Sequence, residues 1–358
     1  MTPEELSNLI NNAVESLITA QKIEKIEIPE IKIERPKSKD HGDFASNIAL
    51  ALSGGRDSAM VALIVARMFK YRHPNISDRE MKEQVSKHFF TAYMGTNNSG
   101  SSTRNAAKIL AQQIGATHYD GDIQKALETH LDIFHMMTGV ELQWNIPEHD
   151  IPLQNVQARL RGSLIWMIAN VHQAILLSTS NKSEAAVGYA TMDGDTSGGL
   201  SPITDVPKSL VIEWLEWAME FYQLTALQDV LSTPATAELR PPEYKQSDED
   251  DLMPFFVLDQ LMYQFVQCGA EPLDMFQILW PSLKEKYQDD AMAFGRHIEK
   301  FVRLICFAQW KRERFAISFR VTAFDLDPKT GFRFPPVQEP FSLEIAEMFD
   351  YISHHFTK

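Results

Sequence analysis

The chain has 358 residues, with 34 Lys and Arg against 48 Asp and Glu, so its formal net charge is −14. This acidity argues against non-specific binding to nucleic acid or to anionic membranes, because attraction to phosphates needs a cationic surface. Two cysteines, Cys268 and Cys306, are too few for a disulfide framework, and the 44% apolar content is that of ordinary globular domains.

No segment predicts a membrane span or a secretory signal. The longest apolar stretch, residues 164–177, is interrupted by Asn170, His172 and Gln173 and is too short to cross a bilayer as a helix. The first five residues lack a basic region followed by an apolar core. We therefore expect a cytoplasmic protein that does not enter the membrane.

The beginning of the chain predicts a small α+β extension. Thr2 would cap a helix whose apolar residues recur at helical spacing up to Ile18, and residues 26–33 alternate as strands do. A different pattern begins near Asn47, because residues 48–52 form a continuous apolar run that is typical of a buried parallel strand.

Strands and helices then alternate along the chain. We predict helices over 59–71, 103–114 and 158–172, and strands over 88–94, 117–119 with Ile123, and 174–178. This order and these lengths favour an α/β fold with a doubly wound parallel sheet. Beyond Pro207 the chain is predicted to be mostly helical, with loops at 233–251 and 325–340.

Residues 53–58, Ser-Gly-Gly-Arg-Asp-Ser, join the first buried strand to a helix. Gly54 and Gly55 allow the backbone to turn tightly and approach a ligand, and the amides at a helix N-terminus favour an anion. Ser53 and Ser58 can donate to phosphate oxygens, and Asp57 can hold a Mg²⁺ ion that bridges phosphates. A plain strand-to-helix turn is the alternative, but the preceding apolar strand favours a pyrophosphate-binding loop. No Gly-Lys-Ser/Thr follows, so this is not the Walker pattern.

This loop resembles the signature of the PP-loop ATP pyrophosphatases, which cleave ATP between the α and β phosphates and adenylate a carboxylate or similar oxygen. Within that group the chain resembles NAD+ synthetase, especially the synthetase portion of the glutamine-dependent type. The matching stretches occur in family order: 155–161, 178–184, 188–195, 206–208, 233–239, 246–249 and 310–312. The resemblance implies the PP-loop, adenine nucleotide α-hydrolase-like fold with a helical C-terminal part.

The resemblance also assigns roles to single residues. Glu184 opens a helix after a strand end, the usual ligand crevice of an open α/β sheet, and the family places a metal-binding Glu there, which would share Mg²⁺ with Asp57. A Glu serving only the helix dipole is the alternative. ATP contacts are implied for Arg159, Thr179, Lys208 and Thr236, and substrate contacts for Arg161, Asp195 and Lys311. For Arg159 and Arg161, two positions apart on a helix, surface ion pairing stays an alternative.

Other clusters receive structural interpretations. The acidic run 247–251 is predicted to be an N-cap followed by a solvated first turn, rather than a metal cluster. The Trp and Met residues of 214–219 are assigned to the core or to a dimer interface, and His354 and His355 to an inert C-terminal tail.

Two positions depart from the short, ammonia-dependent members of the family. Met192 stands where those members have Lys, and Trp310 stands where they have His. Both changes concern how the deamido substrate is held and leave the ATP site unaffected.

The N-terminal segment departs further. The glutamine-dependent type carries a nitrilase-like amidase domain that needs a Glu, Lys and Cys, and no cysteine precedes Ser53 in this sequence. Residues 1–52 instead resemble the start of the arginyl-tRNA synthetase N-terminal domain, through 14–17, 33–36 and 41–50, although the His-x-Gly-His and Lys-Met-Ser signatures of that enzyme are absent. A natural fusion, an added sequence and a chance resemblance all stay open.

These observations predict three parts: an arginyl-tRNA synthetase-like extension at 1–47, an NAD+ synthetase-like PP-loop domain at 48–340, and a C-terminal helix or tail at 341–358. The resemblance implies an ammonia-dependent NAD+ synthase, a ligase that uses ATP, Mg²⁺ and nicotinate adenine dinucleotide, with Asp57, Lys208 and Glu184 as its catalytic set. It also implies a homodimer with the dinucleotide bound across the interface.

Two alternatives to this function stay open. The first is another PP-loop amidotransferase, acting on a nucleotide base or on aspartate. The second is a catalytically inactive, tRNA-associated or regulatory binding protein, which the N-terminal resemblance favours and the net charge of −14 opposes. The sequence also leaves open whether a separate glutaminase supplies the ammonia.

Overall fold

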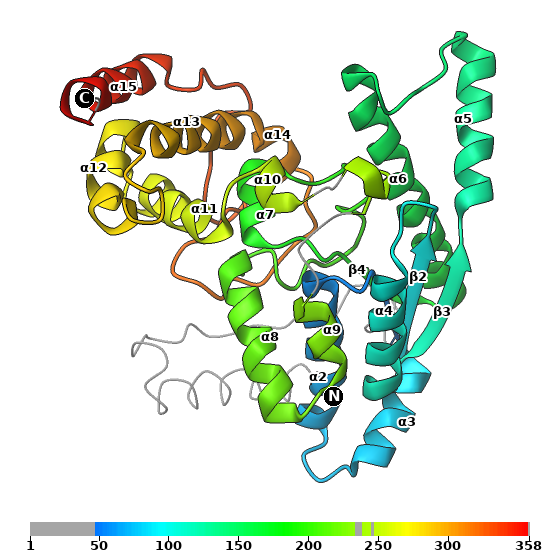
Figure 1. Ribbon diagram of the computed structural model, residues 1–358. Coiled ribbons are helices and arrows are strands. Elements are labelled where there is room, and N and C mark those ends of the chain that lie inside the picture. Colours follow the sequence, from blue (N-terminus) through cyan, green and yellow to red (C-terminus); the bar gives the residue numbers. More distant parts are fainter. Residues whose placement is uncertain (1–46, 233–237, 245–246, 357–358) are drawn as a thin grey trace. The chain divides into compact units, whose positions relative to one another are not determined.

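The computed structural model describes residues 47–232, 238–244 and 247–356 (Figure 1). The helix and strands predicted before Asn47 lie outside these residues, and so does Thr236. Within the described part of the chain, no helix is long and apolar enough to cross a membrane.

A parallel sheet of four strands organises the N-terminal half of the described chain. Its strands are β1 (Asn47–Ala51), β2 (Phe89–Gly95), β3 (Thr117–Asp122) and β4 (Ala174–Leu177), in the order β3-β2-β1-β4. In the register, Leu50 of β1 lies opposite Thr91 on one side and Leu177 on the other. The carboxyl ends of β1 and β4 therefore lie side by side, which brings the 53–58 loop next to the segment after Leu177.

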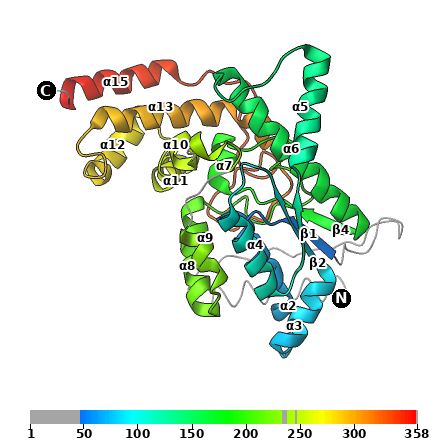
Figure 2. The same ribbon diagram turned by 45° about the vertical axis from the view of Figure 1, so that its right-hand side comes forward.

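Helices cover both faces of this sheet (Figures 1 and 2). One layer consists of α2 (Arg56–Arg72), α3 (Asp78–His88), α4 (Ser101–Ile114), α8 (Lys208–Tyr222) and α9 (Ala226–Ser232), and the other of α5 (Gln124–Thr138) and α6 (Pro147–Val171). Because side chains alternate along a strand, Leu50 and Leu177 face the first layer, whereas Ala49 and Leu176 face α6. The predicted α/β, doubly wound fold is confirmed.

The C-terminal half adds a helical layer with its own core. It comprises α7 (Lys182–Val187), η2 (Pro242–Tyr244), α10 (Asp248–Asp251), α11 (Phe255–Met262), η3 (Tyr263–Gln267), α12 (Pro272–Leu283), α13 (Ala291–Phe307), α14 (Gln309–Arg312) and α15 (Ser342–Phe356). Stacked and tilted rings of Phe276, Trp280 and Phe294 fill this core, and α15 packs Met348 and Ile352 into it. The predicted helical C-terminal part is thus present, and His354 and His355 lie exposed in the last turn of α15.

Three helices differ from the prediction. Helix α6 begins at Pro147, well before the predicted start at 158, and it contains Pro152 as its sixth residue, at an exposed position where the missing N–H removes one bond of the helix. Helix α3 was not predicted, although Ser77 and Glu80 form a capping box at its start. Helix α5 was not predicted either, although Leu127, Leu131 and Phe134 recur at helical spacing and Leu127 is buried.

Candidate active site

The 53–58 loop turns at Gly54, between β1 and α2. Gly54 has φ +80°, and a Cβ atom at this position would lie 2.1 Å from the carbonyl oxygen of Thr103, so only glycine fits here. The Ser58 hydroxyl donates to the Gly55 carbonyl oxygen at 3.0 Å and accepts from the Ser53 amide at 3.3 Å. Within the described residues no side chain caps α2 at Gly55, and the start of a helix favours an anion.

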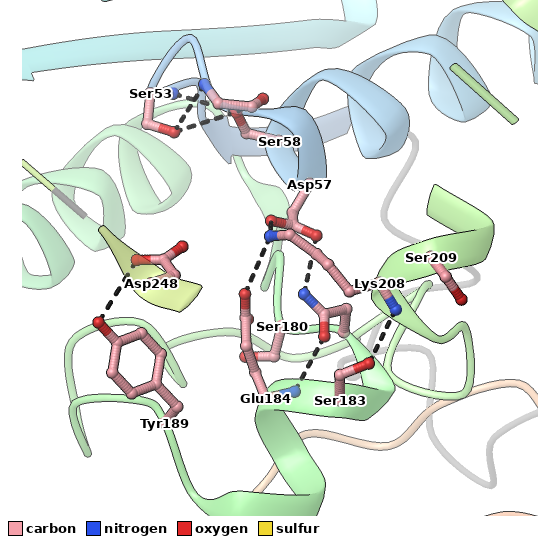
Figure 3. A network of polar contacts seen from close by, with 12 residues as sticks. Ser53, Asp57, Ser58, Ser180, Ser183, Glu184, Tyr189, Lys208, Ser209 and Asp248 are labelled. Carbon is pink, nitrogen blue, oxygen red and sulfur yellow. Dashed lines mark hydrogen bonds and ion pairs between the residues drawn. The ribbon is translucent and has the colours of Figure 1, made fainter. Parts of the chain in front are cut away.

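An ammonium and two carboxylates meet beside this loop (Figure 3). The Lys208 Nζ bonds the Asp57 carboxylate and lies 3.2 Å from Glu184 Oε1, and its side chain is 3% exposed. Asn181 ties the same groups together: its Oδ1 accepts from the Glu184 amide at 2.9 Å, and its Nδ2 donates to Asp57 Oδ1 at 2.9 Å. The predicted catalytic set, Asp57, Lys208 and Glu184, therefore lies in one cluster.

A third carboxylate, that of Asp248, faces this cluster from α10. The residue is 7% exposed, and the Tyr189 hydroxyl donates to its Oδ1 at 3.4 Å and to Asp251 Oδ2 at 2.9 Å. Burial raises the pKa of the Asp248 carboxyl, and the negative charge of Asp57 adds to that effect. The cluster accordingly holds one ammonium against three acidic groups.

Burial and the charge imbalance shift the pKa values of the residues in this cluster. Burial, with the nearby charges of Asp57 and Asp248, raises the pKa of Glu184 from 4.5 to about 8, although Lys208 opposes the shift. Burial alone would lower the pKa of Lys208, but the carboxylates of Asp57 and Glu184 outweigh it and raise that pKa. Lys208 thus stays charged, and the site carries surplus negative charge that a further cation would neutralise.

The donor set fits magnesium. Carboxylate oxygens are the protein ligands that Mg²⁺ prefers, and this ion commonly takes one or two carboxylates and completes its shell with phosphates and waters. In the described part of the chain no three acidic, His or Cys side chains converge as a closed metal cage. Asp57 and Glu184 therefore suit an ion that arrives with a phosphate ligand.

A cavity of about 240 Å³ opens over the 53–58 loop. Its walls include Arg161, Thr179, Glu184, Asp195 and Lys208 among the residues predicted to bind ATP or substrate. Apolar residues also line the cavity, among them Ala92, Met94, Ile165 and Leu176. A lining that is partly charged and partly apolar suits a ligand that carries both phosphates and a flat ring.

Two of the predicted residues point elsewhere. Arg159 is exposed, and its Nε donates to the Met192 carbonyl oxygen at 3.1 Å, whereas Arg161 lines the cavity and donates to the Met94 carbonyl oxygen at 3.0 Å. Lys311 Nζ donates to the carbonyl oxygens of Gly188 and Ala190, at 2.6 and 2.9 Å, which holds the turn that carries Tyr189.

The chain is similar to known proteins in sequence and in fold. A model of the NAD synthase family matches residues 37–288. The chain belongs to the NAD synthase family. It is 32% identical over 273 residues to the glutamine-dependent NAD(+) synthetase of Oryza sativa subsp. indica. This alignment covers 66% of this chain and 37% of that protein. The corresponding enzyme of Synechocystis sp. is 31% identical over 294 residues, with 82% and 45% covered.

A solved structure agrees with these sequence matches. The glutamine-dependent NAD(+) synthetase of Cytophaga hutchinsonii superposes with a TM-score of 0.72 at 32% identity, covering 85% of this chain and 52% of that one. The chain therefore spans about half or less of the length of these relatives. The predicted NAD+ synthetase family and its PP-loop fold are confirmed, while the arginyl-tRNA synthetase resemblance and the domain boundaries stay predictions.

Sequence reasoning missed several groups in the site. The acidic run 247–251 does begin a helix, but the solvated interpretation is wrong for Asp248, which is buried, and Ser247 makes no side-chain cap. Glu238 was also missed: its carboxylate accepts from the Gly100 amide at 3.2 Å and the Thr103 hydroxyl at 2.8 Å, which joins the cavity wall to α4. The sequence did offer one indication of their importance, because both residues lie in stretches that match the NAD synthase family.

Proposed function

We propose that this chain catalyses the ATP-dependent amidation of nicotinate adenine dinucleotide to NAD+, with ammonia as the nitrogen donor and AMP and pyrophosphate as the other products. The observation that carries the proposal is the meeting of the 53–58 loop with Lys208, Asp57 and Glu184 in one cavity. Membership of the NAD synthase family supports NAD+ synthesis by amidation.

The first step is adenylation of the nicotinate carboxylate. A carboxylate oxygen attacks the α phosphorus of ATP, and the bond from that phosphorus to the bridging oxygen of pyrophosphate breaks. The amides at the start of α2 and the ammonium of Lys208 lie where they can stabilise the charge that develops on the leaving pyrophosphate. A carboxylate is a poor acyl electrophile, so the step makes AMP the leaving group for the next one.

Asp57 and Glu184 would hold magnesium, which supplies positive charge across the phosphates when it is bound. The pKa of Glu184, raised to about 8 by burial and by neighbouring carboxylates, supports a cation at this place. In its absence, the proton on Glu184 relieves part of the same negative charge.

The second step forms the amide. The nitrogen of ammonia attacks the acyl carbon, the bond from that carbon to the AMP oxygen breaks, and one proton leaves the nitrogen. The nitrogen donor that we propose is ammonia, whereas the relatives are named glutamine-dependent.

The wall of the cavity supports substrate assignments. Thr179 lies at the end of β4 beside the 53–58 loop, which suits an ATP contact, and Arg161 and Asp195 line the cavity where the nicotinate half could lie. The roles proposed for Arg159 and Lys311 require each side chain to exchange its present carbonyl partners for the ligand. The ATP contact proposed for Thr236 lies outside the described residues.

A cytoplasmic homodimer is part of the proposal. Helix α5 buries one of its 15 residues within the described chain, and the outer faces of α5 and α6 expose large apolar side chains: Met136, Met137, Ile151, Met167 and Val171. Large apolar side chains exposed on two neighbouring helices suit an interface, and a second copy would cover them. Two free cysteines are consistent with a reducing compartment.

The dimer is tested by Met137→Lys, at a side chain that is 80% exposed on α5. We expect the dissociation constant, measured by analytical ultracentrifugation, to rise at least about tenfold, because a buried unpaired ammonium costs more than 1.4 kcal/mol. Ile278→Lys, at an exposed apolar position of α12, is the matched control and should leave the constant unchanged. A wild-type chain that stays monomeric at every concentration would contradict the dimer.

The activity is tested by NAD+ formation with ATP, Mg²⁺ and nicotinate adenine dinucleotide, with ammonium or glutamine as the donor. The proposal expects NAD+ with ammonium and none with glutamine. Pyrophosphate release that depends instead on a nucleotide base or on aspartate would favour another PP-loop amidotransferase. Salt-dependent tRNA binding without ATP turnover would favour the inactive binding protein.

A further inference from the structure

Helix α8 carries Lys208 as its first residue but has no cap of its own. The residue before it is Pro207, whose side chain has no hydrogen-bond acceptor. The first amides of a helix have no partner within the helix and need acceptors from elsewhere. By contrast, α7 is capped locally, because Asn181 immediately precedes it and accepts from the Glu184 amide.

Asp259 of α11 supplies the missing cap from the C-terminal layer. Its Oδ2 accepts from the Ser209 amide at 3.1 Å and from the Ser209 hydroxyl at 2.6 Å. Its Oδ1 accepts from the Ser183 hydroxyl. The Ser183 oxygen in turn accepts from the Lys208 amide at 2.8 Å (Figure 3). The first two amides of α8 are thus satisfied by one carboxylate, directly for Ser209 and through Ser183 for Lys208.

The positions of these serines connect the cap to the site. Ser183 precedes Glu184 on α7, and Ser209 follows Lys208 on α8, so Asp259 joins the two helices that carry the ammonium and its carboxylate partner. We infer that Asp259 is a positioning residue, which holds the backbone of Lys208 in register with Glu184 and Asp57 without touching the ligands. The effect on turnover rests on the proposed function, whereas the effect on the backbone does not.

The charge of the Asp259 carboxylate favours this positioning role over a role in packing alone. A carboxylate at a helix N-terminus interacts with the positive end of the helix dipole, and hydrogen bonds to a charged acceptor are stronger than neutral ones. A catalytic group that shifts by about 1 Å can lose about a hundredfold in rate, so a device that fixes Lys208 matters more for kcat than for ATP affinity.

The test compares Asp259→Asn with Asp290→Asn in the full chain. Asp290 is a matched control, because its carboxylate also caps a C-terminal helix, α13, through the Ala293 amide at 2.8 Å. We expect Asp259→Asn to lower kcat for pyrophosphate release by about 10- to 100-fold with KM for ATP changed less than about threefold. Asp290→Asn should leave both constants within about twofold.

Hydrogen exchange gives a readout that does not depend on turnover. The amides of Lys208 and Ser209 should exchange faster in Asp259→Asn than in the wild type, and not in Asp290→Asn. Ser183→Ala breaks the single link from Asp259 to Lys208 and should speed exchange at Lys208 even if Asp259→Asn fails to fold. In a double-mutant cycle the kcat losses of Ser183→Ala and Asp259→Asn should not add.

The outcomes separate this inference from the proposed function. An inactive wild type would sink the proposed function, while the exchange rates would still decide whether Asp259 holds α8. An active wild type in which Asp259→Asn behaves like Asp290→Asn in kcat and exchange would overturn the positioning role. Fully additive losses in the double-mutant cycle would also overturn it, because Asp259 would then act independently of Ser183.

Discussion

The two halves of the site are built differently. Around the sheet, the groups proposed to face phosphates come from short consecutive segments, residues 53–58 and 178–184, placed side by side by the pairing of β1 with β4. In the helical C-terminal part, the contributors are single carboxylates, Asp248 and Asp259, on α10 and α11. In the first half, neighbouring residues of one loop form the site. In the second half, single carboxylates act on residues far away in the sequence, Asp259 by capping α8 and Asp248 by its charge.

The largest expected effect is at the junction of the two halves. Lys208→Met removes the ammonium that bonds Asp57 and Glu184. We expect kcat for pyrophosphate release to fall about 10²- to 10³-fold, because a preorganised positive group at the leaving phosphates is lost. Lys284→Met, at an exposed lysine of the C-terminal layer, is the control. If kcat of Lys208→Met lies within threefold of that of the control, Lys208 does not belong to the catalytic set.

A second prediction concerns the backbone of the sheet half. Gly54→Ala must accept φ near +80° and a contact of 2.1 Å with the Thr103 oxygen, so we expect a loss of about 2–4 kcal/mol in the free energy of unfolding. Gly55→Ala is the matched control, since its nearest atom would be the Ser53 hydroxyl at 3.4 Å, and it should change stability by less than about 0.5 kcal/mol. Urea unfolding measures both, and equal losses would contradict the account of Gly54.

A third prediction uses the titration of Glu184. Its pKa is raised to about 8, so between pH 5 and 8 the folded state binds a proton that the unfolded state has released, and stability must fall as the pH rises. The raised pKa of Lys208 adds no slope in this window, because the lysine is protonated in both states. Without magnesium, the wild type should lose up to about 1 kcal/mol per pH unit more than Glu184→Gln.

Denaturant unfolding at a series of pH values measures this slope. Burial raises the pKa of Asp248, so any slope that this carboxyl adds has the same sign in the wild type and in Glu184→Gln. Glu216→Gln, at an exposed position of α8, should keep the full wild-type slope. Identical slopes in the wild type and Glu184→Gln would mean that Glu184 is ionised in the folded chain.

The smallest expected effect is a loss of stability on the Asp248 side of the site. Tyr189→Phe removes a hydroxyl that donates to Asp251 at 2.9 Å and to Asp248 at 3.4 Å, and it should lower the free energy of unfolding by about 1–2 kcal/mol. Tyr263→Phe, at a half-exposed ring, should have no measurable effect on stability. A stability loss as large as that of Gly54→Ala would show that the Asp248 side of the site is as constrained as the loop.

The same contrast explains what the sequence could predict. Alternating strands and helices and the glycine-containing turn are local patterns, so the parallel sheet and the 53–58 loop could be predicted from adjacent residues. The pairing of Lys208 with Asp57 spans 151 positions, and it was reached only through resemblance to a family. Asp259 had no such signal, because its partners Ser183 and Ser209 lie 76 and 50 positions away and capping from another helix leaves no local pattern.

The central claim is that this site activates a carboxylate by adenylation. Nicotinate adenine dinucleotide labelled with ¹⁸O in its carboxylate, turned over with ATP, Mg²⁺ and ammonium, tests this directly by mass spectrometry of the products. The account predicts one labelled oxygen in AMP and none in pyrophosphate, because the attacking carboxylate oxygen stays on the α phosphorus. Label in inorganic phosphate together with ADP, or turnover that leaves AMP unlabelled, would contradict it.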